Sequence, residues 1–317
     1  MKILKKLSSL VSSLDTILIV DLASYHLKAI ELLFTSKSLY LKNWMSISLK
    51  QNPNHFQTFA IHHLISWMKT ENITCKKIVT CLAASSVYFG KQPISPQLSR
   101  LSKNQINKFL SSSVASQMEV SSQEIIFDYE PKKPSQRNKF FQVVAVKKEN
   151  ILNLENLFTS VKLKPFHINL DIYALERTIR NEFDPIVEPL AVINIESHRI
   201  LYLIINKHSL VDWDEEFLDQ IDENLLVNSI ISKLKTLICP LKILHLVFGG
   251  NLSIVNSIIP RISVVYEEAA KNFSEVKPRL SISDPLAKIS TSSHLDHTIA
   301  TEMLVALGLA LEVTCEH

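Results

Sequence analysis

Two adjacent glycines, Gly249 and Gly250, follow an apolar stretch and are among the few residues in this chain whose type suits ligand binding. Backbone N–H groups close around a phosphate most easily where glycine permits positive φ angles and close approach. The 317 residues nevertheless contain only 4 glycines, where average usage of about 7% predicts roughly twenty-two. We therefore do not expect a working glycine-rich phosphate loop.

Other chemically capable side chains do not form a recognisable site. His294, Asp296 and His297 lie close in sequence, but no third ligand of fixed spacing completes a metal site. No Ser-His-Asp order or isolated carboxylate pair stands out, so no catalytic residue is expected. The cysteines lack CxxC spacing, which favours buried thiols in a reducing compartment over a metal or redox site. They are Cys75, Cys81, Cys239 and Cys315.

Composition and charge exclude several classes of protein. The 34 basic and 31 acidic side chains leave a net charge of +3, too small to predict a nucleic-acid partner or a membrane-binding surface. With 46% hydrophobic residues, the chain can build two cores of ordinary size. Its apolar runs are shorter than the roughly 20 residues of a membrane span, and no signal-peptide cleavage site follows the N-terminus. A globular cytoplasmic protein is expected.

The elements that must position any site begin with an amphipathic leader over 1–14, followed by three strands that form an antiparallel meander. A helix over His55–Lys69 and a buried strand over Lys77–Ala83 come next. The three strands of the meander are Thr16–Ala23, Leu27–Thr35 and Leu39–Leu49.

A separate α+β unit is predicted over 87–164. It combines a strand near Val87 with a helix over Lys103–Met118, two strands and a second helix. A strand over Phe166–Asp171 and a helix over Ile172–Asn181 then return to the first unit. The two strands and the second helix are Glu124–Glu130, Lys139–Val146 and Glu149–Val161.

The second half repeats the opening meander with the strands Leu190–Ile195, Arg199–Asn206 and Ser209–Trp213, which indicates an internal duplication. We expect a first lobe over 15–86 and 165–188, the inserted unit over 87–164, and a second lobe over 189–317. The acidic run from Asp212 to Glu223 predicts a solvated helix start, with a surface for a basic partner as the alternative. The remaining predicted elements are helices over Glu216–Leu237, after Asn251 and over Ser293–Leu311, and strands over Leu241–Phe248 and Ser263–Tyr266.

Three segments in this order, VDLASYHLK, INIESHRI and VFGGN, resemble the two hairpins and the Gly-Gly turn of the actin-like ATPase superfamily. The resemblance implies an α/β fold with two lobes, each RNase H-like. In that superfamily, glycines in both hairpins hold phosphate and the late Gly-Gly contacts adenosine. Only Trp213–Leu241 separates the second hairpin from the Gly-Gly strand, so the subdomain that covers adenine in relatives is expected to be reduced.

Within the superfamily, the chain is similar to the PilM family of type IV pilus assembly. The matching stretches are IVDLASYHLKAIEL, IIFDYEP, FFQVVAVKKENILNLENLFTSVKLKPFHINLDIYALERTI, AVINIESHRILYLIINKHSLV, SDPLAKI and ALGLALE. This resemblance implies that the α+β unit over 87–164 is the insertion typical of that branch.

The hairpins depart from the family pattern at the phosphate positions. Ala23 and Glu196 stand where the resemblance expects glycine, and a carboxylate at a phosphate position is repulsive by about 1–4 kcal/mol. Asn194 replaces a carboxylate that would help to organise Mg²⁺. ATP and magnesium are therefore not expected as cofactors, and the site is expected to be vestigial. Its residues would be Asp21, Lys28, Asn194, Gly249 and Gly250.

The resemblance implies a non-catalytic scaffold at the inner face of the bacterial inner membrane. Its partner would be the N-terminal cytoplasmic tail of a PilN-like single-span protein, bound in a groove between the first lobe and the inserted unit. Phe109, Val114, Met118 and Phe127 are candidates for lining that groove, or alternatively for filling the core of the inserted unit. An active ATPase of the same machinery and a filament-forming actin relative remain as alternative functions.

Overall fold

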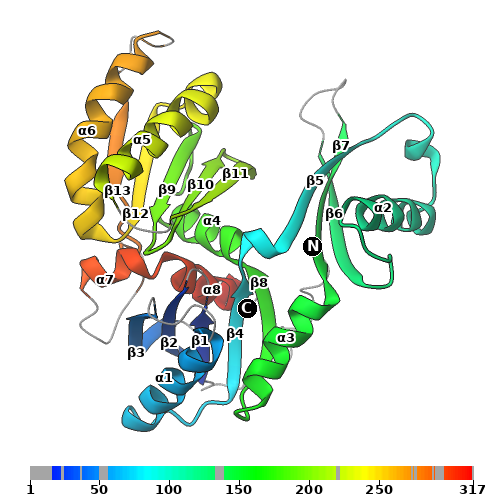
Figure 1. Cartoon of the computed structure of the whole chain (residues 1–317), viewed down its shortest axis with the longest axis vertical. Coiled ribbons are helices and arrows are strands. Elements are labelled where there is room, and N and C mark those ends of the chain that lie inside the picture. The colour runs from blue at the N-terminus through cyan, green and yellow to red at the C-terminus, as the bar shows by residue number, and fades with distance from the viewer. Residues whose placement is uncertain are drawn as a thin grey trace.

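The chain folds into two lobes and a smaller unit that projects from the first lobe (Figure 1). The structure is a computed structural model and describes residues 16–22, 25–35, 38–49, 56–132, 139–218, 222–272, 274, 277–287, 289 and 296–315. The leader predicted over 1–14 lies outside these residues. None of the helices in these ranges is long and apolar enough to cross a bilayer.

The first lobe is built on a five-stranded sheet with the order β3-β2-β1-β4-β8. The first three strands in sequence pair antiparallel, and β4 and β8 add to β1 in parallel. Strand β1 is apolar on both faces, which is typical of a strand covered on both sides. Its Ile17 and Ile19 face the second lobe, whereas Leu18 and Val20 face the outer helices. The strands are β1 (Thr16–Asp21), β2 (His26–Thr35), β3 (Ser38–Ser48), β4 (Lys77–Leu82) and β8 (Lys164–Leu170).

The second lobe repeats this sheet in the order β11-β10-β9-β12-β13. Again three antiparallel strands come first and two parallel strands follow. The predicted duplication is therefore confirmed at the level of strand order and direction. The strands are β9 (Leu190–Ile195), β10 (Arg199–Ile205), β11 (Leu210–Phe217), β12 (His245–Gly250) and β13 (Arg279–Ile282).

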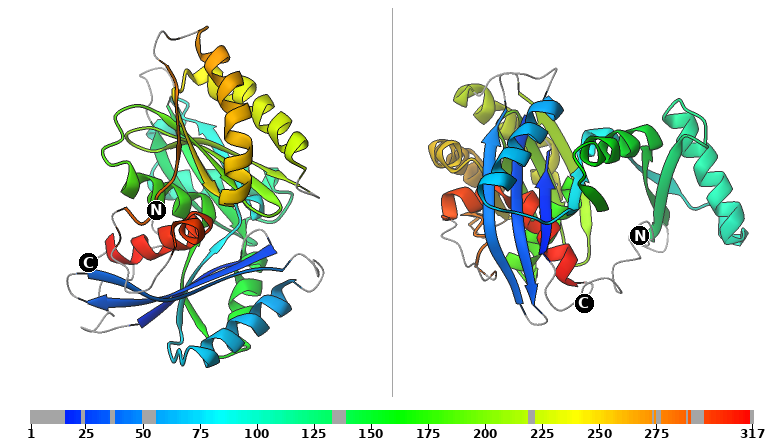
Figure 2. Two further views of the ribbon diagram at one scale, coloured as in Figure 1. Left: turned by 90° about the vertical axis from the view of Figure 1, so that its left-hand side faces the viewer. Right: turned by 90° about the horizontal axis from the view of Figure 1, so that it is seen from below.

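Helices cover the outer face of each sheet, and two further helices lie between the lobes (Figures 1 and 2). Helices α1 (Phe56–Thr70) and α3 (Lys148–Thr159) cover the first sheet, and α5 (Glu223–Lys233) and α6 (Leu252–Ala270) cover the second. Helices α4 (Asp171–Glu182) and α8 (Leu304–Cys315) pack between the sheets, and the short α7 (His297–Glu302) precedes α8 in sequence and contacts β12 and α6. Because neighbours surround α8, nearly all its residues are apolar.

Gly308 explains how closely the two central helices approach. A Cβ at this position would lie 1.8 Å from the backbone oxygen of Ala174 on α4. Thr178, one turn further along α4, donates to the Leu304 carbonyl of α8 at 2.7 Å. The two helices and both sheets share one hydrophobic core, so the lobes are joined by packing as well as by chain connections.

The inserted unit is a three-stranded sheet, β5-β7-β6, with one helix against it. Its elements are β5 (Val87–Pro93), α2 (Lys103–Gln117), β6 (Ile125–Lys132) and β7 (Phe140–Lys147), with 3-10 turns at Ala84–Ser86 and Leu98–Arg100. Leu154 and Phe158 of α3 are buried in the outer core of the first lobe. By this packing, α3 lies with the first lobe rather than with the unit expected over 87–164.

The strand predicted over Ser263–Tyr266 is wrong, because this segment is part of α6. The β-branched residues after Pro260 suggested a strand. Helical spacing nevertheless continues across the exposed proline: Val255, Ile258, Ile262 and Tyr266 are all buried on one side of the helix. The parallel strand that completes the sheet is β13 instead.

The helix predicted from Glu216 is also wrong at its start, because β11 continues to Phe217 and α5 begins at Glu223. Most of the acidic run therefore lies on a strand. Its end does begin a helix: Asp222 caps α5 by accepting from the backbone N–H groups of Asn224 and Leu225 at 2.8 and 3.0 Å. A π turn (Leu234–Ile238) and a 3-10 turn (Cys239–Leu241) continue α5 toward β12. The segment thus holds one helix and no covering subdomain in its described part.

Candidate functional site

The two hairpins predicted to form a nucleotide site face each other between the lobes, and a direct ion pair joins them. Lys28 of β2 lies opposite Asp21 of β1 in the first hairpin. Its Nζ contacts Oε1 of Glu196, which follows β9 in the second hairpin, at 2.6 Å. The Asp21 carboxylate is 3.7 Å from the same ammonium group. All three side chains are buried.

Arg199 extends this contact into a network deep in the second lobe. Its Nε and Nη2 donate to Oε2 of Glu196 at 3.1 and 3.0 Å. Its Nη1 donates to Oδ2 of Asp171, the first residue of α4, at 2.5 Å. A further carboxylate, Glu215 of β11, lies 3.5 Å from Nη1. Glu196 therefore accepts from one cation of each lobe, and we call these six residues the interlobe ionic network: Asp21, Lys28, Asp171, Glu196, Arg199 and Glu215.

The charges within the network favour the protonated, positively charged forms of Lys28 and Arg199. Burial by itself lowers the pKa of Lys28, but the charges of Glu196 and Asp21 outweigh it and leave the pKa above its ordinary value. The pKa of Arg199 is likewise raised, because Asp171 and Glu196 outweigh its burial. Burial raises the pKa of Asp171 despite the opposing charge of Arg199. Each cation is stabilised by carboxylates of this chain.

Asp171 is fixed by backbone donors as well as by Arg199. Its Oδ1 accepts from the N–H groups of Ala84 and Ile172 at 3.0 and 2.7 Å. Ala84 begins the turn after β4, so this carboxylate joins the first sheet, α4 and the second hairpin. It is fully buried.

Gly249 and Gly250 lie beside the second hairpin, and the packing of this chain explains why both are glycine. Gly250 has a φ of 92°, and a Cβ there would lie 1.9 Å from the Ile195 oxygen. A Cβ at Gly249 would lie 2.2 Å from Cδ1 of Leu304 and 3.2 Å from Oδ1 of Asn194. At Gly250 the obstacle to a side chain is the backbone of β9, whereas at Gly249 it is the Leu304 side chain of α8.

The space left between the hairpins is small. A cavity bordered by Lys28, Glu196, Gly250 and Glu302 has a volume of about 10 Å³. That is room for about one water molecule, whereas pockets for small ligands measure about 300–1,000 Å³.

The structure brings together all five residues predicted for a vestigial nucleotide site: Asp21, Lys28, Asn194, Gly249 and Gly250. Sequence reasoning missed the partners Asp171, Arg199 and Glu215. One signal was available, because the two hairpins have the same spacing between paired residues: Asp21 pairs with Lys28, and Asn194 pairs with Leu201. When the two segments are aligned in this way, Glu196 and Arg199 both fall in the turn of the second hairpin, where an ion pair between them can form.

The histidines considered for a metal site do not form one in the described part of the chain. His297 contacts Oδ1 of Asp284 through Nδ1 at 3.0 Å. Asp296 caps α7, and His294 lies outside the described residues. No group of three or more His, Cys, Asp or Glu residues suited to a metal ion occurs among the residues that the structure describes.

A second candidate site is a groove between the first lobe and the inserted unit, with a volume of about 330 Å³. One wall is the edge strand β8, from Pro165 to Leu170. The opposite wall is formed by β6 and β7 of the inserted unit, and α3 contributes Ile151 and Glu155. We call this space the β6–β8 groove.

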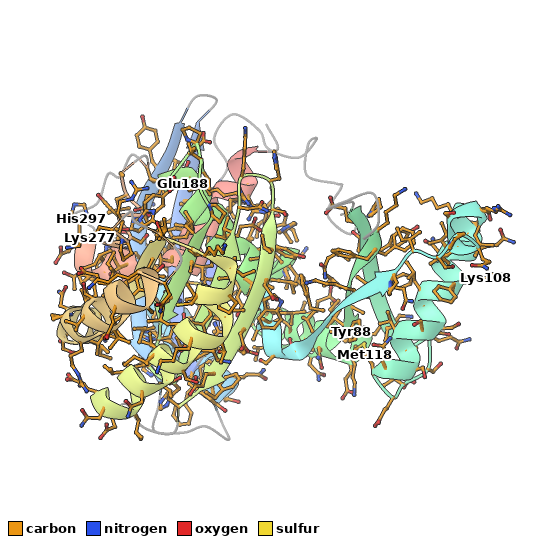
Figure 3. All side chains as sticks on the ribbon, turned by 90° about the horizontal axis from the view of Figure 1, so that it is seen from above. Tyr88, Lys108, Met118, Glu188, Lys277 and His297 are labelled. Carbon is orange, nitrogen blue, oxygen red and sulfur yellow. The ribbon has the colours of Figure 1, made fainter. Side chains whose placement is uncertain are left out.

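The four residues predicted to line a partner groove lie elsewhere. Val114 is only 2% exposed in the core between α2 and its sheet, and Met118 and Phe127 pack against that core. Phe109 is exposed on α2, and Met118 lies beside Tyr88 in the inserted unit, apart from the two lobes (Figure 3). Helix α2 covers the face of the sheet opposite to the groove. Phe127 points to that face, whereas its neighbours Ile126 and Asp128 line the groove.

Comparison with known proteins identifies similar folds but no close relative. No family model matches the chain, and no curated protein matches it. PilM in a PilM–PilN type IV pilus biogenesis complex superposes with a TM-score of 0.69 at 13% identity, over 93% of this chain and 98% of that chain.

Two further solved structures share the architecture less closely. The cytoplasmic domain of EpsL, from the type II secretion system of Vibrio cholerae, has a TM-score of 0.50 at 13% identity and covers 94% of this chain and 95% of its own. A Bacteroides thetaiotaomicron protein of unknown function with an actin-like ATPase fold has a TM-score of 0.50 at 8% identity, with 86% and 92% covered. The chain therefore has a two-lobed actin-like ATPase fold similar to that of PilM, as the sequence predicted.

Proposed function

We propose that this chain is a non-catalytic scaffold of a type IV pilus or a related secretion or competence apparatus. Its partner would be the N-terminal cytoplasmic tail of a single-span inner-membrane protein similar to PilN. Through that partner the protein would sit at the inner face of the membrane. The observation that carries the proposal is the PilM similarity, which covers 93% of the chain and so cannot omit the inserted unit.

The β6–β8 groove supports the binding part of this proposal. It lies between the first lobe and the inserted unit, with the edge strand β8 on one side and the face of the sheet formed by β6 and β7 on the other. Extended peptides bind to such places by adding main-chain hydrogen bonds to a strand edge and by placing alternate side chains in apolar pockets.

The interlobe ionic network supports the non-catalytic part. The Glu196 carboxylate contacts Lys28 at 2.6 Å, at the position where relatives with a glycine hairpin would admit a phosphate. A nucleotide phosphate would have to displace this carboxylate and then lie next to it, and like charges at such a distance repel. The cavity of about 10 Å³ adds a steric obstacle.

Peptide binding is tested with the N-terminal tails of any short single-span membrane proteins that the neighbouring genes encode. Synthetic peptides of about 25 residues from their N-termini would be titrated against the full-length protein. We expect dissociation constants of tens of micromolar or tighter for one of them. Absence of binding for every tail would reject the scaffold proposal.

A thermal melt with Mg-ATP separates the scaffold from the ATPase alternative. A ligand at 100 times its Kd stabilises a protein by about 2.7 kcal/mol, which is readily detected. We expect no change of melting temperature at millimolar Mg-ATP. A clear rise would favour the active ATPase, and filaments seen by electron microscopy with nucleotide would favour the filament-forming relative.

A further inference from the structure

The β6–β8 groove presents an apolar surface that the described helices and strands leave uncovered. Most of the residues that line it are apolar, including Ile126 of β6, Val144 of β7, Ile151 of α3 and Ile168 of β8. Phe166 of β8 also lines the groove and is 37% exposed. A contiguous apolar hollow of this kind marks a place where another segment packs.

The leader over 1–14 is the segment of this chain whose sequence suits such a surface. Together with Asp15 it precedes β1, and these 15 residues are the longest stretch outside the described residues. Its apolar residues recur at the spacing of one side of a helix, and lysines and serines fall between them. An amphipathic helix binds by laying its apolar side into a hydrophobic groove. The apolar residues of the leader are Ile3, Leu4, Leu7, Leu10, Val11 and Leu14.

The order of the strands brings the end of the leader close to the groove. Strand β4 runs parallel to both β1 and β8, and its Ile78 pairs with Leu18 on one side and with Pro165 on the other. Because neighbouring strands lie about 4.8 Å apart, Leu18 is about 10 Å across the sheet from Pro165, where the groove begins. A helix of 14 residues is about 21 Å long, and β8 is about 23 Å long. The leader can therefore reach the groove and extend along it.

Covalent attachment makes this docking favourable even if the leader binds weakly as a free peptide. A short connection holds a segment at an effective concentration of about 1 mM near its site. With a dissociation constant of about 100 µM as a free peptide, the leader would occupy the groove in about 90% of molecules.

We propose that the leader docks in the β6–β8 groove of its own chain, with Leu7 and Leu10 packed against the apolar lining. This docking does not depend on the identity of any partner. Its consequence rests on the proposed function: the leader is an autoinhibitory segment that a partner tail must displace. A groove that is occupied in about 90% of molecules binds such a tail about tenfold more weakly than a vacant one.

Photo-cross-linking in the full-length protein tests the docking directly. A benzophenone amino acid replaces Leu7, on the apolar side of the leader, or Ser12, on its polar side. We expect cross-links from position 7 to β6, β7, β8 or α3 of the same chain, with a yield about fivefold higher than from position 12. The yield should not change on dilution, because the reaction is intramolecular. Cross-links to other parts of the chain, or only between two molecules, would overturn the inference.

Substitutions in the groove locate the docked leader more closely. Phe166→Ala removes an apolar lining residue, and Phe109→Ala is the matched control, because Phe109 is similarly exposed but lies on α2, outside the groove. If Phe166→Ala weakens docking about tenfold, the occupied fraction falls from about 90% to about 50%, so the cross-linking yield from position 7 should fall about twofold. Phe109→Ala should leave it unchanged. Equal yields in both variants would place the leader elsewhere. Melting temperatures check that both variants are folded.

Binding of a partner tail to leader variants separates the inference from the proposed function. Leu7→Ser with Leu10→Ser weakens the leader and leaves the groove intact, whereas Ser9→Ala with Ser12→Ala changes only its polar side. The first variant is expected to bind the tail about tenfold more tightly than the native protein, and the second equally well. If a tail binds all three proteins equally, the leader does not compete and the inference is wrong, while the scaffold function stands. If no tail binds but cross-links reach the groove, the docking stands and the scaffold function fails.

Discussion

The carboxylate of Glu196 contacts a buried cation from each lobe. At a phosphate position a carboxylate is repulsive toward nucleotide, and that much follows from the sequence. The structure adds that Glu196 accepts from Lys28 of the first lobe and from Arg199 of its own lobe. It thus shares its charge between two buried cations, which also face Asp21 and Asp171 respectively.

Replacing Glu196 by glutamine tests this role. Removing one partner of a buried ion pair leaves uncompensated charge, so we expect Glu196→Gln to lower the free energy of unfolding by about 3 kcal/mol. The matched control is Glu188→Gln, because Glu188 pairs with Arg279 at 3.6 Å with both side chains mostly exposed. That variant should change the free energy by less than about 1 kcal/mol. Denaturant unfolding measures both, and equal effects would contradict a special role for Glu196.

Glu196→Gly restores the residue type that the superfamily has in this hairpin and leaves Lys28 and Arg199 without their shared carboxylate. We expect inorganic phosphate at about 10 mM to raise the melting temperature of this variant and not that of the native protein, because only the variant has a vacant anion position. Sodium chloride at matched ionic strength is the control. An equal response of the native protein would show that phosphate acts elsewhere.

At the residue scale, the sequence identified Asp21, Lys28 and Glu196 because family motifs place them. It did not identify Asp171, which is distant in sequence and reaches the network only because α4 begins beside the turn after β4. Such a contact depends on how two elements pack, and no spacing rule reveals it.

At the scale of elements, Gly250 is required by the pairing of β12 with β9. We expect Gly250→Ala to lower the free energy of unfolding by at least about 3 kcal/mol, because a Cβ would clash with the Ile195 backbone and the φ of 92° is unfavourable for alanine. Gly90→Ala is the control within a strand. The nearest atoms to a Cβ there belong to the end of the Tyr88 side chain, which can turn away, so a loss of about 1 kcal/mol or less is expected. Chemical denaturation of both variants decides the matter, and similar losses would contradict a fold-imposed glycine.

Prediction of elements succeeded where the hydrophobic period was regular and failed where local propensity opposed packing. The β-branched residues after Pro260 favour a strand locally, yet the buried side of α6 continues to Tyr266. In β11, acidic residues resemble a helix start, but their alternation with Val211 and Trp213 fits a strand that pairs with β10. Tertiary packing decides both cases, and it was not available from one sequence.

The alternation of β6 explains why Phe127 fills the core of the inserted unit, the alternative that the sequence left open, and does not line the β6–β8 groove. Phe127 is aromatic and attractive as a peptide contact, but it packs against the core under α2. Its neighbours Ile126 and Asp128 face the groove. In a strand a shift of one residue changes the face, and the sequence did not reveal which face α2 would cover.

At the scale of the whole molecule, the two lobes share one core and the inserted unit has its own. The shared core includes Val79 of the first sheet, Val192 of the second and Leu175 of α4 between them. The core of the inserted unit centres on Leu110 and Val143. The duplication was predicted from the sequence and accounts for the two similar sheets. Their common core, however, forms because α4 and α8 pack between them.

This division of cores predicts how the molecule loses structure. Leu175→Ala and Leu110→Ala remove the same atoms from fully buried positions, and each is expected to cost about 2–5 kcal/mol in its own core. In native-state hydrogen exchange, Leu175→Ala should reduce the protection of β1 and β9 together, because both sheets rest on the same helix. Leu110→Ala should reduce protection in β6 and β7 and leave β1 and β9 unchanged. If Leu175→Ala exposed only one of the two large sheets, the lobes would be separate cooperative units. The ionic network between the hairpins, rather than the shared core, would then have to account for their association.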